Sequence, residues 1–400
     1  MFLMNRIVFI SAGPGNPQYL LPIAHQVIAQ SQVLIGRPDL LDLWEHQNKV
    51  KLTINMDSLF HQLIEFQKKY ELTAVLISGD ATLFSLLNDI HFPLNIEVIP
   101  GISSFQYFCS RLKINWNTLK IINLHGNKNL APFILALEQG YEMMVFTGGL
   151  HSATNLLKIA ALVSPNRMGA LGVNLSLPGE FIQSGSVQEL YNIYLSESDL
   201  ALIYLSPGEK KGIGFFEDED YFRTNIPFSK KETRMMVCSL LELSPAMTVL
   251  EIGGGSGGIT IDIARRISEG ILFSLEKNQE AFQLIQKNCE RFRIDNVQCI
   301  HGTAPNDIPQ KLFDRIFIGG SGGSLSSIIE NSSKLLKKGG ILVMTALSLL
   351  HVTEGLNRFK NNPFQALSVF QQSISRIDPN DKNLMMKSLN PIFFIKAVKS

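Results

Sequence analysis

The chain has 400 residues, of which 45% are hydrophobic and only 18% are charged. A chain of this length and apolar content buries the cores of two or three domains, which excludes a disordered protein. Its 36 lysines and arginines balance 35 aspartates and glutamates, which excludes the strong positive field and basic stripe that recruit nucleic acid.

Neither a targeting segment nor a metal framework is indicated. Asn5 and Arg6 interrupt the apolar N-terminus and no charged region precedes it, so we expect no signal peptide. The longest apolar run, residues 340–350, is too short to cross a bilayer. The four cysteines lack C-x-x-C spacing, which predicts buried thiols rather than a metal site or disulfides. We therefore expect a cytoplasmic protein without membrane or metal partners.

The first part of the chain repeats one pattern, a short apolar strand followed by a loop of glycine and small polar residues. Strands are predicted at 6–12, 33–35, 74–77 and 96–99, with helices at 18–30, 59–70 and up to 112. The loops contain Gly13 to Pro17, Gly36-Arg37-Pro38, Ser78-Gly79-Asp80 and Pro100 to Ser104. Because ligands bind at the C-terminal ends of parallel strands, the loops together predict one site. A purely structural origin for any single loop is the alternative.

Residues 119–205 have the pattern of a second α/β lobe. Strands are predicted at 119–124, 143–146, 168–173, 181–184 and 200–204, with helices at 130–137 and 153–162. The turn-rich, charged residues 206–212 indicate a linker, and the acidic run at 217–220 is expected to be exposed. We predict a first domain at 1–206, a linker at 207–216 and a second domain at 217–400.

The most informative stretch lies in the second domain. The predicted strand 248–252 contains Glu251 and runs into a glycine-rich turn at 253–258 and then a helix. Glycines permit positive φ and close approach of a ligand, and a helix N-terminus favours an anionic group. The next strand, 271–275, leads to Glu276, roughly 20 residues after the turn, where an acid accepts hydrogen bonds from ribose hydroxyls. A nucleoside-containing cofactor is predicted, and a structural turn with two surface acids is the alternative.

The remainder of the second domain predicts a mostly parallel sheet. Ser229 and Glu232 form a predicted capping box at the start of a helix that runs to Leu243. Strands at 297–300, 315–318 and 341–344 alternate with helices, whereas 364–373 and 391–398 are two strands without a helix between them. This ending is typical of a parallel sheet closed by an antiparallel hairpin.

The second domain resembles the class I methyltransferases that use S-adenosylmethionine. The resemblance is carried by Glu251-x-Gly253-x-Gly255-x-Gly257, by Glu276 at the ribose position and by Gly302-Thr303-Ala304-Pro305 beside the adenine. The motifs Phe317 to Gly323 and Ser229-Lys230-x-Glu232-x-Arg234 resemble the decarboxylating, C15-methylating component of corrin-ring synthesis. The resemblance implies a Rossmann-like fold and cofactor binding by Ser229, Glu251, Gly253, Gly254, Gly255, Ser256, Gly257, Glu276 and Ala304.

The first domain resembles the tetrapyrrole methylases, whose fold has two α/β lobes. Its loops at 13–17, 78–80 and 100–104 match that family in order, and Leu124-His125-Gly126 is similar to the C5-methylating branch. The two halves in this order resemble the bifunctional precorrin-6Y C(5,15)-methyltransferases (decarboxylating) of cobalamin biosynthesis. The resemblance implies one S-adenosylmethionine per domain, a precorrin substrate and a homo-oligomer. For the first domain it implies cofactor binding by Pro14, Gly79, Asp80, Ser103 and Ser104.

Methyl transfer from a sulfonium depends on alignment of the reactants more than on acid or base catalysis. The catalytic residues therefore stay unassigned. If a side chain takes part in proton transfer, His125 and Asp80 are the candidates. A polycarboxylate substrate predicts basic residues in the cleft, for which a solvated surface charge is the alternative. The substrate-binding candidates are Arg37, His125, Lys230, Arg234, Gly320, Ser321 and Gly322.

Three other functions stay open at this point. The first domain departs from its family at Leu20-Leu21-Pro22, Ala81-Thr82 and Asn127, so it could be a scaffold that docks the tetrapyrrole without methylating it. The second is a Rossmann-type NAD-dependent oxidoreductase. Only the glycine pattern favours this function, and Glu251 and the terminal hairpin argue against it. A methyltransferase of RNA or protein is the third, although the near-zero net charge weighs against RNA.

Overall fold

The structure, a computed structural model, describes residues 5–43, 50–53, 59–84, 96–196, 201–210, 212–361, 363–377 and 382–400. The chain forms two compact units. Unit 1 comprises Met1–Lys128 and Gly140–Gly208, and unit 2 comprises Asn129–Gln139 and Glu209–Ser400. The predicted domain limits at 206 and 217 stay predictions. Leu200 of a predicted strand and Lys211 of the predicted linker lie outside the described residues.

Unit 1 begins with a parallel five-stranded sheet in the order β3-β2-β4-β1-β5. The central strands β1 and β4 are almost wholly buried, as continuous apolar runs in a parallel sheet should be. The edge strand β3 has little alternation of buried and exposed residues, and it is not among the strands predicted from the sequence. The elements are β1 (Arg6–Ser11), β2 (Val33–Gly36), β3 (Val50–Thr53), β4 (Leu72–Ile77), β5 (Ile96–Ile99), α1 (Pro22–Gln30), α2 (Pro38–Asp42) and α3 (Leu59–Lys69).

The predicted helix 18–30 is in fact two elements. A short 3-10 helix, Pro17–Tyr19, ends before Leu20 and Leu21, and α1 starts at Pro22. Proline suits the first turn of a helix because its missing N–H would have no partner there, and it fixes the helical φ. The family departure at Pro22 therefore sets where α1 begins.

The second lobe of unit 1 is a mixed sheet in the order β6-β7-β10-β8-β9, in which only β6 and β7 pair in parallel. Helix α4 packs its buried aromatic face against this sheet. The elements are α4 (Ser104–Leu112), β6 (Lys120–Asn123), β7 (Met143–Phe146), α6 (Ala153–Val163), β8 (Met168–Val173), β9 (Phe181–Ser186), α7 (Val187–Tyr191) and β10 (Ala201–Leu205). The helix between β6 and β7, α5 (Ala131–Glu138), belongs to unit 2.

Unit 2 is built on a seven-stranded sheet in the order β13-β12-β11-β14-β15-β19-β16. Strands β11 to β15 are parallel, and β19 is antiparallel to both β15 and β16, which confirms the predicted closure by an antiparallel hairpin. The strands are β11 (Thr248–Ile252), β12 (Ile271–Glu276), β13 (Val297–His301), β14 (Phe313–Ile318), β15 (Leu336–Ala346), β16 (Phe364–Gln372) and β19 (Ile392–Lys399).

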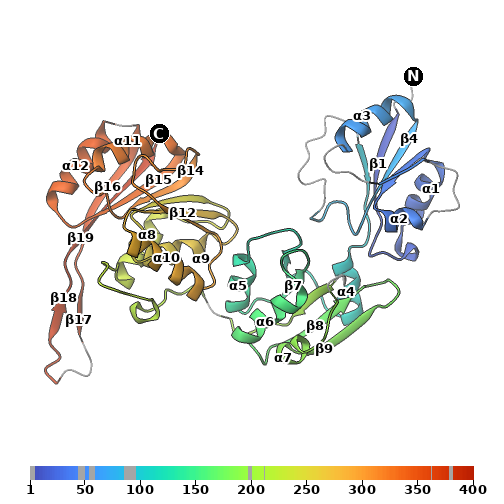
Figure 1. Cartoon of the computed structure of the whole chain (residues 1–400), viewed down its shortest axis with the longest axis horizontal. Helices are drawn as coiled ribbons and strands as arrows, with labels where there is room; N and C mark the ends of the chain where they lie inside the picture. The colour runs from blue at the N-terminus through green and yellow to red at the C-terminus, as the bar shows by residue number, and fades with distance from the viewer. Residues whose placement is uncertain are drawn as a thin grey trace. The chain divides into compact units, whose positions relative to one another are not determined.

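Helices cover both faces of this sheet (Figure 1). Helices α11 and α12 pack on one face, and α8, α9 and α10 pack on the other, because alternate residues of the strands point to opposite faces. The helices are α8 (Lys231–Leu241), α9 (Gly258–Arg266), α10 (Gln279–Arg291), α11 (Leu325–Leu335) and α12 (Leu349–Lys360). Within the described part of the chain no helix is both long and apolar enough to cross a membrane.

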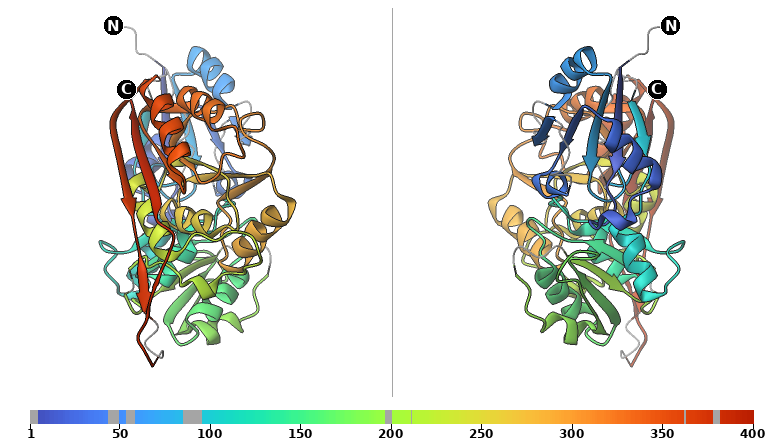
Figure 2. Two further views of the ribbon diagram at one scale, coloured as in Figure 1. Left: turned by 90° about the vertical axis from the view of Figure 1, so that its left-hand side faces the viewer. Right: turned by 90° about the vertical axis from the view of Figure 1, so that its right-hand side faces the viewer.

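A two-stranded ribbon extends the antiparallel edge of unit 2. Strands β16 and β19 run side by side and continue into β17 (Ser375–Ile377) and β18 (Met386–Ser388), which pair with each other (Figure 2). The sequence predicts the two long strands but not this continuation, which consists of short and largely exposed segments.

A buried ion-pair network joins α8 to α9. The Arg234 side chain is fully buried and donates to Asp262 at 2.5 Å and Asp218 at 3.0 Å. It also donates to the Tyr221 hydroxyl at 2.9 Å and the Phe216 carbonyl at 2.8 Å. Asp218 is only 2% exposed, so the prediction that the whole acidic run at 217–220 is exposed was wrong at this residue.

The predicted capping box at Ser229 is also wrong. The N-cap of α8 is Lys230, and no capping hydrogen bond comes from its side chain. The Asp218 carboxylate instead accepts from the Lys231 N–H at 2.9 Å, and Glu232 binds Arg376 of β17. A carboxylate supplied by the tertiary structure thus takes the place of the local serine, and it also suits the positive end of the helix dipole.

We expect Arg234→Met to lower the free energy of unfolding by about 3–5 kcal/mol, because it removes the buried guanidinium that lies nearest to two buried carboxylates. Urea unfolding followed by circular dichroism measures this loss. Arg223→Met is the matched control, since Arg223 is exposed and such substitutions usually change stability by less than about 0.5 kcal/mol. Equal stability of the two variants would contradict a structural role for the Arg234 network.

Candidate functional site

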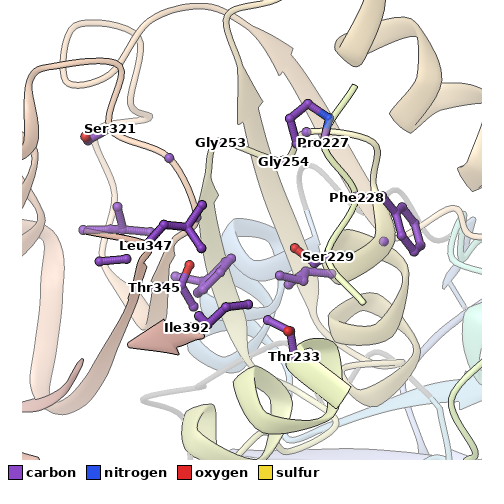
Figure 3. Close-up of a pocket in the computed structure, with 18 of the residues that line it drawn as sticks. Pro227, Phe228, Ser229, Thr233, Gly253, Gly254, Ser321, Thr345, Leu347 and Ile392 are labelled. Carbon is purple, nitrogen blue, oxygen red and sulfur yellow. The ribbon is translucent and has the colours of Figure 1, made fainter. Parts of the chain in front are cut away.

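A cavity in unit 2, the unit 2 pocket, lies beyond the C-terminal ends of β11, β12, β14 and β15 and has a volume of about 940 Å³ (Figure 3). Strand β11 is flanked by β12 and β14, so the order of the strands reverses here, and open parallel sheets bind ligands at such reversals. Of the residues predicted for the second domain's site, it is lined by Ser229, Lys230, Glu251, Gly253, Gly254, Gly255, Ser256, Glu276, Gly320, Ser321 and Gly322.

The glycine loop after β11 is shaped by two kinds of constraint. Gly253, Gly255 and Gly257 have φ values of 81°, 56° and 85°, a region that other residues rarely adopt. A Cβ on Gly253 would also lie 2.7 Å from the backbone nitrogen of Gly320, in the loop after β14. The loop is held by Glu276, whose carboxylate accepts from the Gly255 N–H at 2.9 Å and the Asn278 N–H at 2.8 Å. Glycine here permits the approach of two loops as well as the approach of a ligand.

Glu251 is a fully buried carboxylate in the wall of the pocket. One oxygen, Oε2, accepts from the hydroxyls of Thr260 at 2.6 Å and Ser274 at 2.7 Å. The other, Oε1, has no hydrogen-bond partner. Burial raises the pKa of Glu251 to about 7, although both hydroxyl donors work in the opposite direction. A cationic ligand group at Oε1 would complete the site and favour the ionised form.

Three residues predicted for this site lie outside the pocket wall. Arg234 cannot reach a ligand, because its guanidinium is enclosed by the buried network with Asp218 and Asp262. Ala304 packs into the apolar core on the α11 side of the sheet. A Cβ on Gly257 would lie 3.2 Å from the Ile285 Cα, so this glycine faces α10. These three positions therefore do not line the pocket, and their binding roles stay predictions.

A second cavity, the unit 1 pocket, has a volume of about 290 Å³. The loops after β1 and β4 meet there, where Gly13 and Gly79 exchange backbone hydrogen bonds of 3.1 and 2.8 Å. The loop after β5 contributes the N-terminus of α4, where Ser103 forms a capping box with Gln106. The pocket brings together all the residues predicted for the first domain's site, namely Pro14, Arg37, Gly79, Asp80, Ser103, Ser104 and His125.

Several of these side chains already have partners within the protein. Arg37 pairs with Asp39 through two hydrogen bonds of 3.0 and 2.8 Å, and His125 Nδ1 lies 3.3 Å from the Thr147 carbonyl oxygen. Asp80 Oδ1 accepts from both the backbone and the hydroxyl of Thr82 at 2.8 Å. This last contact involves a position where the sequence departs from its family, so Thr82 stabilises the loop around Asp80.

The unit 2 pocket also contains residues that sequence reasoning missed. Thr345 lies near the end of β15 and Leu347 follows the strand, and Figure 3 shows Thr345 and Ile392 across the pocket from Ser229 and Thr233. The rule that ligands bind after parallel strands was a usable signal for the residues after β15. No such signal exists for Gln372 and Asn390, which reach the pocket only through the pairing of β16 with β19. The missed residues include Thr233, Thr345, Leu347, His351, Gln372, Ile374, Leu389, Asn390 and Ile392.

Comparison with known proteins gives one match for each half of the chain. A family described as the precorrin methyltransferase domain matches residues 220–373, and the tetrapyrrole (corrin/porphyrin) methylases match residues 6–191. The chain is 33% identical to the probable cobalt-precorrin-6B C(15)-methyltransferase (decarboxylating) of Sulfurisphaera tokodaii, over 46% of this chain and 96% of that protein. It is 30% identical to the cobalt-precorrin-6B C(15)-methyltransferase (decarboxylating) of Salmonella typhimurium, over 46% of this chain and 95% of that protein.

Two solved structures each align with about half of the chain. A precorrin-6Y C5,15-methyltransferase from Geobacter metallireducens aligns with a TM-score of 0.45 and 27% identity, over 47% of this chain and 98% of that one. A precorrin-6Y methylase from Archaeoglobus fulgidus aligns with a TM-score of 0.40 and 20% identity, over 51% of this chain and 99% of that one.

We expect Glu251→Gln to change how stability depends on pH. The folded-state pKa of about 7 lies above the ordinary value of 4.5, so the folded wild type binds a proton more tightly and becomes less stable as pH rises between these values. The glutamine variant lacks this loss. Urea unfolding measures the free energy of unfolding at pH 5 and at pH 8. Between these two pH values, the wild type should lose about 2–3 kcal/mol more of this free energy than the variant does. Parallel stability profiles would mean that Glu251 ionises normally.

Proposed function

The chain belongs to the family of decarboxylating precorrin C(15)-methyltransferases, and from this premise we propose that it has two methyltransferase sites, one in each unit. It is an enzyme that transfers methyl groups from S-adenosylmethionine to a precorrin in cobalamin biosynthesis. In the proposal, unit 2 methylates C15 and removes carbon dioxide from an acetate side chain, and unit 1 methylates C5. Because the chain belongs to this family, we set aside the two alternative functions, an NAD-dependent oxidoreductase and an RNA or protein methyltransferase. The homo-oligomer stays a prediction.

The unit 2 pocket fits S-adenosylmethionine in charge and in shape. The cofactor carries two positive groups, a sulfonium and an ammonium, and Glu251 Oε1 is a buried acceptor without a partner in the pocket wall. Gly253, Gly254 and Gly255 present backbone without side chains on the same side. Glu276 also lines the pocket at the end of β12, where it could meet the ribose hydroxyls. We propose that these residues hold the cofactor.

The role of the protein in the reaction is alignment and exclusion of water. S-adenosylmethionine supplies an electrophilic methyl group on a good leaving group, and the macrocycle supplies an electron-rich carbon. A fixed near-attack geometry can provide an effective molarity on the order of 10⁵ M or more, so no general base is needed. Methyl transfer leaves a positive charge on the conjugated ring, which then accepts the electron pair released when carbon dioxide leaves. The methylated ring carbon loses its proton to water, and the side-chain carbon takes up a proton from water. The same cleft therefore serves both steps and shields the intermediate from water.

The unit 1 pocket favours the hypothesis that unit 1 is a second methyltransferase site over the hypothesis that it only docks the tetrapyrrole. It gathers every residue predicted for the first domain from the loops after five strands, β1, β2, β4, β5 and β6. The unusual Ala81 does not obstruct it, because Ala81 is fully buried and its N–H donates to Ser11 Oγ at 2.9 Å. This pocket is the observation that carries the proposal of two sites in one chain.

Calorimetric titration of the whole chain with S-adenosylhomocysteine should give two sites. Gly320→Leu should remove the unit 2 site, because a Cβ at Gly320 meets only Gly253 Cα, at 4.0 Å, and the longer side chain would fill the pocket. Ser104→Phe should remove the unit 1 site in the same way. Unchanged unfolding midpoints would show that both variants fold. One site in the wild type that Ser104→Phe leaves intact would make unit 1 a scaffold.

Mass spectrometry of the products should then separate the two reactions. With a precorrin-6 substrate, the Ser104→Phe variant should add one methyl group with loss of carbon dioxide. The Gly320→Leu variant should add one methyl group without that loss. Methylation by unit 2 that leaves the acetate intact would contradict the proposal that one cleft performs both steps.

A further inference from the structure

One face of the ribbon root, where β16 and β19 leave the sheet, forms a wall of the unit 2 pocket. Gln372 pairs with Ile392 across the two strands, and the Leu389 N–H donates to the Ile374 carbonyl at 2.8 Å. Side chains two residues apart on a strand share a face, which places Gln372 with Ile374 and Asn390 with Ile392. All four line the pocket. We call these four residues the ribbon wall.

The ribbon wall is tied to the opposite side of the pocket by an ion pair. Arg376 comes next on the face of Gln372 and Ile374, and it binds both carboxylate oxygens of Glu232, at 3.0 and 2.5 Å. It also lies 3.4 Å from the buried Asp218. Because Glu232 is in the first turn of α8, beside the pocket residues Lys230 and Thr233, this bidentate pair fixes the ribbon relative to α8.

The ribbon wall is too far from Glu251 to hold the same chemical group. Three strand-to-strand steps separate β11 from β19 in the sheet, which amounts to about 14 Å. The pocket volume of about 940 Å³ is also near the upper end of the range for a single ligand, about 300–1,000 Å³. The distance therefore indicates a second ligand group beside the one at Glu251.

The chemistry of this side of the pocket suits a flat apolar ring with polar groups on its rim. Ile374, Leu389 and Ile392 supply apolar surface, and Leu347 is 71% exposed. Gln372 Oε1 is buried and has no hydrogen-bond partner. Such an orphan is costly unless a ligand supplies the partner, and an amide can present a donor or an acceptor by rotation. Lys230 adds a positive charge across the pocket.

We propose that the ribbon wall is the seat of the tetrapyrrole in unit 2, with Gln372 and Asn390 as positioning residues that hydrogen-bond its rim. The Arg376–Glu232 pair holds this wall at the distance from the glycine loop that methyl transfer requires. The inference rests on the proposed function of unit 2 and assigns its substrate side to residues that come from the hairpin rather than from the parallel strands.

The test compares two neighbouring glutamines in the full-length chain. Gln372→Leu should raise KM for a precorrin-6 substrate about tenfold in the C15 reaction, with little change in kcat and an unchanged affinity for S-adenosylhomocysteine. Gln371→Leu is the matched control, because Gln371 is exposed on the other face and its amide donates to Ser373 Oγ at 3.2 Å. Asn390→Leu should raise KM as Gln372→Leu does. Gln372→Asn keeps an amide, so its KM should lie between those of the wild type and Gln372→Leu.

Weakening the Arg376–Glu232 pair should also raise KM for the tetrapyrrole. Glu232→Gln removes the charge that holds Arg376, so KM for the tetrapyrrole should rise severalfold while cofactor affinity stays constant. Equal KM values for the Gln372→Leu and Gln371→Leu variants in an active enzyme would overturn the inference alone. A wild type that binds S-adenosylhomocysteine but never methylates the tetrapyrrole would overturn the proposed function, and the inference with it.

Discussion

The carboxylate of Asp218 is the contact on which the architecture of unit 2 depends. One oxygen accepts from the Lys231 N–H and from Arg234, and the other faces Arg376 at 3.4 Å and Lys230 at 3.8 Å. A buried carboxylate is tolerated only when it is paired and hydrogen-bonded. The N-terminus of α8, the buried arginine and the ribbon must therefore assemble around it. The N-terminus of α8 and the root of the ribbon border the pocket.

Each end of the unit 2 pocket contains a buried polar oxygen that has no hydrogen-bond partner. Glu251 has one such oxygen, and burial raises its pKa more than the two hydroxyl donors lower it, so a cationic ligand would further favour its ionised form. Gln372 is likewise unsatisfied at the opposite end. Unpaired polar atoms in an otherwise well-packed protein are typical of ligand sites, where stability is lower than the fold alone would allow.

Both units place ligand-binding loops at the C-terminal ends of parallel strands, but they build them differently. In unit 2 one reversal of strand order opens a pocket within a single sheet. In unit 1 the loops after β1, β4 and β5 meet residues from the second sheet, such as Asn123 and Thr147, in a smaller cavity. Under the proposed function both frames serve methyl transfer, which requires alignment of two ligands rather than a fixed set of catalytic side chains.

The sequence by itself determined the features that depend on short-range pattern. The glycine loop with Glu251 and Glu276, the loops of unit 1 and the antiparallel end of the sheet follow from local periodicity and from positions where only glycine is tolerated. Tertiary structure alone decided the roles of residues whose partners are distant in the chain. Asp218, Arg234 and Arg376 look like surface charges until folding brings them together. Gln372 enters the pocket because β19 pairs with β16, and no spacing in the sequence encodes that contact.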